Sequence, residues 1–473
     1  MKINLPLVLC VLVFGVLITY RSFVIPITHD EASSWLNYHT TPIWSCFFDP
    51  KCWGTANNHW LNTLLFQWSE FFFGNDPWAL RLPNVLAGWG YLAGAALLCS
   101  RYIKTFVLQV LGFLLLCSHV YLLDFFSLAR GYGIMTCGVM WGMYALIRYT
   151  ELWNIRSLLI CITSVFLAIL GNFTAILAYA SLGLVWLILV FVKRKTNLLF
   201  RHGAYWAMSA VVLFLLLRLP VQTLSASGEF TQGAANVYET GVNLMQSIMY
   251  GRNYIGPSTP QVLLVFFLLL ILVFLVRVQL RKPSDNRPFI IVTTLLFANI
   301  LMIVLQQLIT GSHTPVGRKS IYLIPLIFGA VSLGFACTGN NRMKLLGAGV
   351  IIVLLVFHTS RVLDFRSVRE WYYDAYYPEL LSTILPGGAG TDSVHLATSW
   401  IFYPALNFYK ETVPLPFSDL PYQRPLVIDT SKQYYFVETP DSTGFYERGF
   451  HHQKSIGPFF LFKNSRPGVF DAD

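Results

Sequence analysis

Residues 260–279 read PQVLLVFFLLLILVFLVRVQ, and this stretch decides the class of fold. It holds an unbroken apolar run from Val262 to Val276. A helix needs about 20 predominantly apolar residues to cross the hydrocarbon core of a bilayer. The stretch therefore predicts a helix that spans a membrane.

Further apolar runs lie on both sides of this stretch. Only 12% of the 473 residues are charged, about half the share in a soluble domain. The first run is an uncleaved span rather than a signal peptide, since no small-residue cleavage pattern follows it at Tyr20-Arg21-Ser22-Phe23. We expect an all-α polytopic membrane protein with eleven spans, at residues 3–24, 81–100, 105–126, 132–147, 157–174, 175–192, 203–219, 260–279, 289–309, 319–337 and 344–358.

Basic residues mark one side of the membrane. Lys and Arg are enriched in cytoplasmic loops, and five alternate loops carry them on the side that also holds Lys2: Arg101 and Lys104; Arg148 and Arg156; Lys193, Arg194, Lys195 and Arg201; Arg277, Arg281, Lys282 and Arg287; Arg342 and Lys344. The N-terminus is therefore expected in the cytoplasm. The net charge of +10 reflects topology, and we expect no nucleic-acid partner.

The remaining segments are expected on the outer face. The aromatic run 61–73 is too short to cross at about 1.5 Å per residue and predicts a helix in the membrane interface. The loop 220–259 is expected to be mobile and to order over substrate. Residues 1–360 would form the transmembrane domain and residues 361–473 a small α/β domain, with strands at Ser393–Thr398, Pro425–Asp429, Tyr434–Glu438 and Gly457–Lys463 and a helix around Pro404–Glu411.

Cys46 and Cys52 are the two cysteines in a predicted outer loop. That compartment permits a disulfide, but spacing alone does not fix the geometry, so the bridge is left open.

Acidic and polar motifs follow the first span. A carboxylate of Thr28-His29-Asp30-Glu31 could accept a proton from a hydroxyl nucleophile. The alternative is that Asp30 and Glu31 only cap the helix that follows. Asn57-Asn58-His59-Trp60 offers amides and an imidazole to a sugar or phosphate, or forms a turn. A divalent metal on these histidines and acids stays an open alternative, although their spacing fits no compact zinc pattern.

Cations lie where topology disfavours them, at the outer ends of two predicted spans. Arg130 and Tyr132 belong to Ala129-Arg130-Gly131-Tyr132, and Arg130 could bind an anion, snorkel, or pair with Asp124. Arg318 and Lys319 open the tenth span, four residues before Tyr322. They could bind phosphate or anchor the helix in the interface. Together the acids, amides and cations predict a site for an anionic, lipid-linked substrate.

At these residues the chain resembles the membrane-embedded glycosyltransferases of the C-type superfamily, in the branch of protein O-mannosyltransferases and aminoarabinose transferases acting on lipid A. Five motifs carry the resemblance over about residues 1–330: His29-Asp30-Glu31, Asn58-His59, Leu80-Arg81-Leu82-Pro83, Ala129-Arg130-Gly131-Tyr132, and Arg318 with Tyr322 and Pro325. Trp60 stands where the family commonly has proline, and the C-terminal domain matches no family pattern.

The resemblance implies an inverting transfer of a sugar from a polyprenyl phosphate to a hydroxyl acceptor, a protein, lipid or glycan, at the outer face of a bacterial inner or plasma membrane. Asp30 would be the base. Arg130, Arg318 and Lys319 would hold the donor phosphate. Glu31, Asn58, His59, Tyr132 and Tyr322 would bind the substrates. No cofactor is implied, because phosphate is a leaving group of low pKa that needs no proton.

Three other functions remain open. A polyprenyl-lipid transporter or flippase would share the spans, although transporters usually place ionisable groups near the bilayer midplane. A ligase that moves a whole lipid-linked glycan would share the anionic donor. A membrane scaffold that presents residues 361–473 as a binding module would leave the outer cations without a role.

Overall fold

The computed structural model describes residues 4–53, 55, 57–281, 286–337, 342–385, 394–413, 415–417 and 420–465. Lys2, Lys282 and Ser393, on which the predictions above partly rest, lie outside these residues. The chain forms two compact units. The first comprises Met1–Phe23, Pro42–Phe72 and Trp78–Leu363, and the second Val24–Thr41, Phe73–Pro77 and Asp364–Asp473. The acidic motif at residues 28–31 therefore belongs to the same unit as the C-terminal region.

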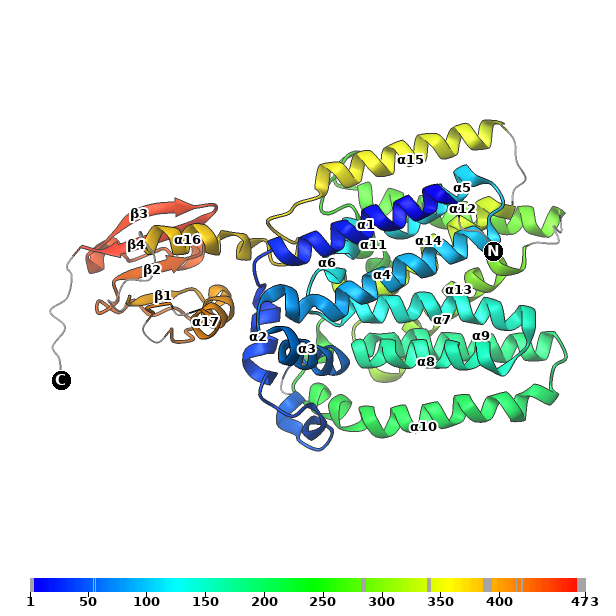
Figure 1. Ribbon diagram of the computed structural model, residues 1–473, viewed down its shortest axis with the longest axis horizontal. Coiled ribbons are helices and arrows are strands. Elements are labelled where there is room, and N and C mark those ends of the chain that lie inside the picture. Colours follow the sequence, from blue (N-terminus) through cyan, green and yellow to red (C-terminus); the bar gives the residue numbers. More distant parts are fainter. Residues whose placement is uncertain are drawn as a thin grey trace. The chain divides into compact units, whose positions relative to one another are not determined.

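The first unit is a bundle of helices, the longest of which run in nearly the same direction (Figure 1). Its α-helices are α1 (Leu5–Val24), α3 (Trp60–Phe73), α4 (Pro77–Tyr102), α5 (Phe106–Cys117), α6 (Val120–Phe126), α7 (Tyr132–Leu152), α8 (Ile155–Gly171), α9 (Ile176–Val192), α10 (Asn197–Ala226), α11 (Val237–Ile248), α12 (Thr259–Arg281), α13 (Arg287–Thr310), α14 (Ile324–Cys337) and α15 (Arg342–Val362). Short 3-10 turns are η1 (Ile43–Phe47), η2 (Pro50–Trp53), η3 (Phe173–Ala175), η4 (Glu229–Thr231) and η5 (Gly317–Leu323).

Each of the eleven predicted spans coincides with helix. Within the described residues, eight helical segments are long and apolar enough to cross a membrane, or nine if a bent pair forms one span. That pair is α5 and α6, which meet at 64° where a continuous helix was expected over 105–126. Neither α7 nor α8 is among the eight, and α8 is the shorter of the two at 17 residues. The chain is a multi-pass integral membrane protein.

Packing explains which helices form the centre of the bundle. The helix α14 contacts α5, α7, α12 and α13, and 83% of its most apolar window, with η5, is buried. Only 11% of the corresponding window of α15 is buried within the protein. Most of this helix is therefore available to contact lipid. The short helix α3 buries Asn62, Thr63, Phe66 and Ser69 and exposes Trp68, Phe71 and Phe72, a division that suits the membrane interface.

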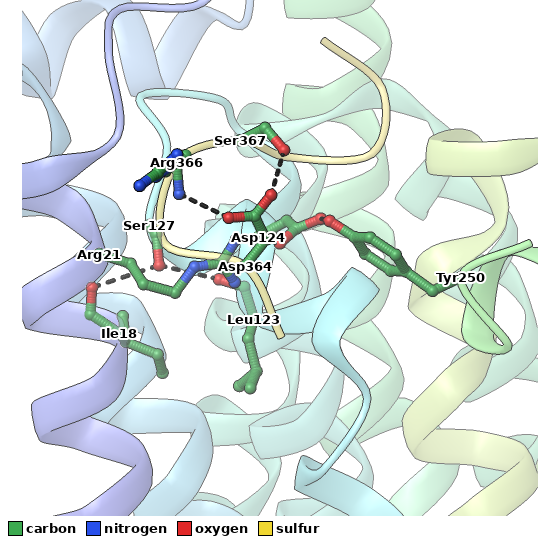
Figure 2. A network of polar contacts seen from close by, with 9 residues as sticks. All are labelled: Ile18, Arg21, Leu123, Asp124, Ser127, Tyr250, Asp364, Arg366 and Ser367. Carbon is green, nitrogen blue, oxygen red and sulfur yellow. Dashed lines mark hydrogen bonds and ion pairs between the residues drawn. The ribbon is translucent and has the colours of Figure 1, made fainter. Parts of the chain in front are cut away.

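One buried ion pair connects three helices of the first unit (Figure 2). Arg21 on α1 donates to Asp124 on α6 at 2.6 Å, and both side chains are almost fully buried. Tyr250, just after α11, donates its hydroxyl to the other carboxylate oxygen of Asp124 at 3.0 Å. Ser127 adds a hydrogen bond to the carbonyl of Ile18 at 3.2 Å. The ends of α1, α6 and α11 are thereby joined through one carboxylate.

The second unit combines short helices with a small sheet. Its helices are α2 (His29–Tyr38), η6 (Tyr372–Tyr376), α16 (Tyr377–Ile384), η7 (Trp400–Phe402), α17 (Tyr403–Thr412), η8 (Thr439–Asp441) and η9 (Tyr446–Arg448). Its strands are β1 (Leu396–Thr398), β2 (Tyr434–Val437), β3 (Phe450–Ile456) and β4 (Phe459–Asn464), in the order β1-β2-β4-β3. The pair β1 and β2 is parallel, and the other two pairs are antiparallel. Where the C-terminal segment of the unit begins, Asp364 accepts from the backbone N–H of Arg366 and from the Ser367 hydroxyl (Figure 2).

The predicted strand at Pro425–Asp429 is wrong. Two backbone N–H groups of this segment bond to side chains rather than to a neighbouring strand. Val427 N–H donates to the Gln423 side chain, and Asp429 N–H donates to the Tyr435 hydroxyl. The strand β3 was not predicted from the sequence. It is an edge strand whose side chains between Phe450 and Ile456 are all exposed, so it lacks the apolar alternation of a half-buried strand.

Candidate functional site

The acidic motif opens helix α2 in the second unit. The helix begins at His29, and Thr28 is its N-cap. Glu31 Oε2 accepts from the Thr28 backbone N–H at 3.0 Å and from the Thr28 hydroxyl at 2.9 Å. Glu31 is thus the third residue of a capping box. The capping alternative holds for Glu31, whereas Asp30 is the second helical residue and is 6% exposed.

A second set of predicted residues gathers in the first unit. Arg130 is 1% exposed and donates to the carbonyl and the side chain of Asn57 at 3.4 and 3.2 Å. Its guanidinium is therefore buried rather than snorkelling, and Asp124, the partner considered for it, is paired with Arg21. Asn58 donates to Cys52 O and accepts from Thr63. Cys52 forms a disulfide with Cys46, which closes the segment just before these amides.

His59 has a defined protonation state. Burial, followed by the charges of Arg130 and Arg318, lowers the pKa of His59 well below its usual value of 6.5. The ring is therefore neutral at physiological pH. Arg130 and Arg318 also lie close enough to the His59 ring to disfavour its protonated form.

Asn172 fixes the tautomer of this neutral ring. Its side-chain oxygen accepts from Thr174 N at 3.0 Å and from the Thr174 hydroxyl at 2.6 Å, so its amide nitrogen faces His59 Nδ1 at 3.3 Å. An amide nitrogen only donates, so Nδ1 accepts and the ring proton lies on Nε2. Within the described part of the chain His59 Nε2 is buried without a hydrogen-bond partner. It is an N–H group available to a ligand.

The remaining cations, Arg318 and Lys319, lie in the same unit as His59. The Arg318 guanidinium lies 5.9 Å from the ring centroid of Tyr132, and Tyr132 contacts the His59 ring at 4.9 Å. Lys319 Nζ donates to Gln232 O at 3.2 Å. Tyr322 differs from the others, because it is fully buried and its hydroxyl donates to Asn299. Its contacts are those of a packing residue in η5.

A cavity of about 620 Å³ adjoins His59 within the first unit. This volume lies in the usual range of about 300–1,000 Å³ for small-molecule sites. Its polar wall includes Asn58, His59, Asn172, Gln306 and Lys319. Its apolar wall comes from α8, α9 and α10, through Leu170, Ile176, Leu177, Leu217, Val221 and Leu224. The lining therefore offers hydrogen-bond donors to a polar head and apolar surface to hydrocarbon, and it also includes one carboxylate, Glu229.

The structure groups the predicted residues into two sets, one in each unit. Asn58, His59, Arg130, Tyr132, Arg318 and Lys319 lie together in the first unit, whereas Asp30 and Glu31 lie in the second. Asn172 belongs to the first set, yet in the sequence it lies near the end of the predicted span 157–174 and was not among the candidate residues. Within the residues that the structure describes, no group of three His, Cys, Asp or Glu side chains could hold a metal ion.

The fold of the chain, with its helical bundle and small sheet, is also found in a solved protein structure. The structure is similar to that of ArnT from Cupriavidus metallidurans in the apo state, with a TM-score of 0.51 and 12% identity over 96% of this chain and 97% of that one. At this identity the likeness establishes the fold.

Two further solved structures are more distant. ArnT bound to undecaprenyl phosphate gives a TM-score of 0.49, with the same identity and coverage. The archaeal oligosaccharyltransferase AglB from Archaeoglobus fulgidus, in complex with an inhibitory peptide and a dolichol-phosphate, gives 0.46 at 12% identity over 97% of this chain and 74% of that one. In comparisons of sequence alone, no family model and no curated protein matches the chain.

Proposed function

We propose that this chain is an inverting glycosyltransferase that moves a sugar from a polyprenyl phosphate to a hydroxyl acceptor at the outer face of a bacterial inner or plasma membrane. The fold is that of membrane glycosyltransferases, and the donor class is the one that the resemblance implies. The observation that carries the proposal is the cavity beside His59, whose lining contains both polar and apolar residues. A lipid phosphate has an anionic head and an apolar chain, which are the two chemistries that the walls of this cavity complement.

The residues of the first unit would bind the donor. His59 supplies a neutral N–H donor, and Lys319 supplies a positive charge in the cavity wall. Arg130 and Arg318 lie close enough to His59 to lower its pKa. Their charges would therefore favour an anion there and would stabilise the negative charge that develops as the phosphate leaves.

In the proposed reaction Asp30 acts as the base. The acceptor oxygen forms a bond to the anomeric carbon, the bond from that carbon to the phosphate oxygen breaks, and the electron pair leaves with the phosphate. The hydroxyl proton passes to Asp30. A single displacement inverts the anomeric centre, and no acid is needed because the phosphate leaves without protonation.

The test uses the purified full chain in detergent, with undecaprenyl phosphates that carry labelled mannose, glucose or aminoarabinose, and bacterial membrane extract as the acceptor source. We expect Asp30→Asn to lower label transfer at least about 100-fold while undecaprenyl phosphate still binds. Asp429→Asn, in an exposed turn of the same unit, is the matched control. Undiminished transfer by Asp30→Asn would contradict the assignment. Passage of intact labelled lipid across a vesicle bilayer without transfer would instead support a flippase.

A further inference from the structure

The segment that leads into Asp30 is held by residues from the far end of the chain. The Ile27 backbone N–H donates to the Tyr409 hydroxyl at 3.1 Å, and the His29 N–H donates to Asp374 Oδ2 at 2.7 Å. The His29 ring bonds to Ile401 O at 2.7 Å. These partners lie 345 to 382 positions later in the sequence, yet all belong to the second unit.

Asp374 is the centre of this arrangement. It is 2% exposed, and its other carboxyl oxygen accepts from the Tyr377 hydroxyl at 2.7 Å. The Tyr377 ring contacts the Tyr409 ring at 6.1 Å. The three residues therefore form a connected group that bonds to the chain directly before and at the start of α2.

The bond to His29 completes the first turn of α2. The first N–H groups of a helix have no partner within the helix. Glu31 satisfies the Thr28 N–H through the capping box, and Asp374 satisfies the His29 N–H. The helix itself packs against α17, where Trp35 contacts Phe408 at 5.0 Å. Both the start of α2 and its buried side are thus fixed by the C-terminal region.

A carboxyl group at this position also carries an electrostatic cost. Burial raises the pKa of Asp374 well above its usual value, while bonds from Tyr377 and His29 lower it and the nearby charges of Glu31 and Asp30 raise it. A buried acid beside two others is unfavourable unless it is well hydrogen-bonded. The gain from this arrangement is a defined position for the residue that follows His29, which is Asp30.

We propose that Asp374 is a positioning residue for Asp30, supported by Tyr377 and Tyr409, so that the C-terminal region determines where the base of the reaction lies. This inference rests on the proposed role of Asp30. It gives the C-terminal region a function in the chemistry itself, in addition to any contact it makes with an acceptor. A displacement of about 1 Å in a reacting group can lower a rate about 100-fold.

The test compares Asp374→Ala with Asp374→Asn in the full chain, in the transfer assay above. The alanine removes both acceptors, and we expect kcat to fall about 10- to 100-fold with the KM for the donor unchanged, because the donor groups belong to the first unit. The asparagine keeps a carbonyl for the His29 N–H and can donate to the Tyr377 oxygen, so it should restore most of kcat. Hydrogen exchange at Ile27 and His29 should be faster in the alanine variant only.

A double variant separates positioning from other causes. In an Asp30→Asn background, Asp374→Ala should lower the residual rate by less than twofold, because there is no base left to misplace. If Asp30→Asn abolishes transfer but Asp374→Ala keeps kcat within twofold of the wild type, the positioning role is refuted and the proposed function stands. If Asp30→Asn leaves transfer unchanged, the assignment of Asp30 as the base fails, and the positioning role fails with it. If the wild type transfers no label from any of the donors, the proposed function itself fails.

A milder variant keeps the test decisive if Asp374→Ala does not fold. Tyr409→Phe removes only the oxygen that accepts from Ile27 and keeps the ring that packs in the unit. We expect a three- to tenfold loss of kcat at unchanged donor KM, whereas Tyr446→Phe, on an exposed tyrosine of the same unit, should be neutral. Equal kcat in the two tyrosine variants would overturn the proposal.

Discussion

His59 shows how a residue that is charged in many binding sites can serve as a neutral donor. Two arginines and burial keep its ring uncharged, and Asn172 places the remaining proton on Nε2. The arrangement separates two tasks, since the arginines supply long-range attraction and His59 supplies a directed hydrogen bond. A protonated histidine here would add a third positive charge that the two arginines disfavour.

We predict that His59→Leu weakens the binding of undecaprenyl phosphate about 10- to 100-fold, because a hydrogen bond to a charged group contributes about 1.5–3 kcal/mol. His59→Gln retains an N–H donor and should lose much less. The wild-type ring stays neutral as the pH falls from 8 to 6. The affinity of the wild-type protein for undecaprenyl phosphate should therefore show no change due to titration of His59 in that window. Ligand titration in detergent measures both effects. A leucine variant that binds as tightly as the wild type would exclude His59 from the site.

At the level of elements, the ion pair of Arg21 and Asp124 joins α1, α6 and α11 (Figure 2). Removing one partner of a buried pair leaves a buried charge and typically costs about 3–5 kcal/mol. We therefore predict that Asp124→Asn destabilises the first unit by about this amount, even though the amide can still accept from Tyr250. Thermal and denaturant unfolding of the purified chain would measure the loss.

The pair of Lys454 and Glu379 provides the control for this prediction. Its side chains are 44% and 46% exposed, and exposed pairs contribute about 0–1 kcal/mol. Glu379→Gln should therefore leave the unfolding transition almost unchanged. If Asp124→Asn and Glu379→Gln shifted the unfolding transition equally, the Asp124 carboxylate would not stabilise the contact of the three helices more than an exposed ion pair does.

The sequence predicted helices and strands well where a single interaction determines the local structure. Every predicted span coincides with helix, because an apolar run in a membrane has little alternative to the helix. The break between α5 and α6 was not predicted, since Ser118 and His119 interrupt the apolar pattern only briefly. The edge strand β3 was missed because exposed polar residues fill it, and Pro425–Asp429 was misassigned because side-chain hydrogen bonds outcompete a strand partner.

The site could be predicted as residue types but not as contacts. Asp30, His59 and Arg130 stand out in the sequence because charged and polar groups beside apolar spans are conspicuous. The residues that orient them do not. Asn172 and Asp374 sit in an ordinary turn and a tyrosine-rich segment, and their partners are 113 and 345 positions away. Only the tertiary fold brings such residues together.

At the scale of the whole molecule, the residues with proposed roles belong to two different units. The donor-binding groups belong to the helical unit, and Asp30 belongs to the unit that contains the C-terminal sheet. The chain passes between the units within a few residues of the catalytic motif, after Phe23 and again after Thr41. We therefore expect a variant of the C-terminal region that displaces Asp30 to lower kcat without changing donor binding.

The orientation of the molecule in the membrane gives the last prediction. Basic loops favour the cytoplasm, so the loop at Lys193-Arg194-Lys195 should lie inside the cell and the C-terminal region outside. Thr196 and Thr430 are both exposed and can be changed to cysteine without altering charge. In intact cells a membrane-impermeant maleimide should label Thr430→Cys at once and Thr196→Cys only after permeabilisation. The unsubstituted chain, whose six free cysteines are buried or partly buried, gives the background. The reverse pattern would place Asp30 on the cytoplasmic side, where a donor on the outer leaflet could not reach it.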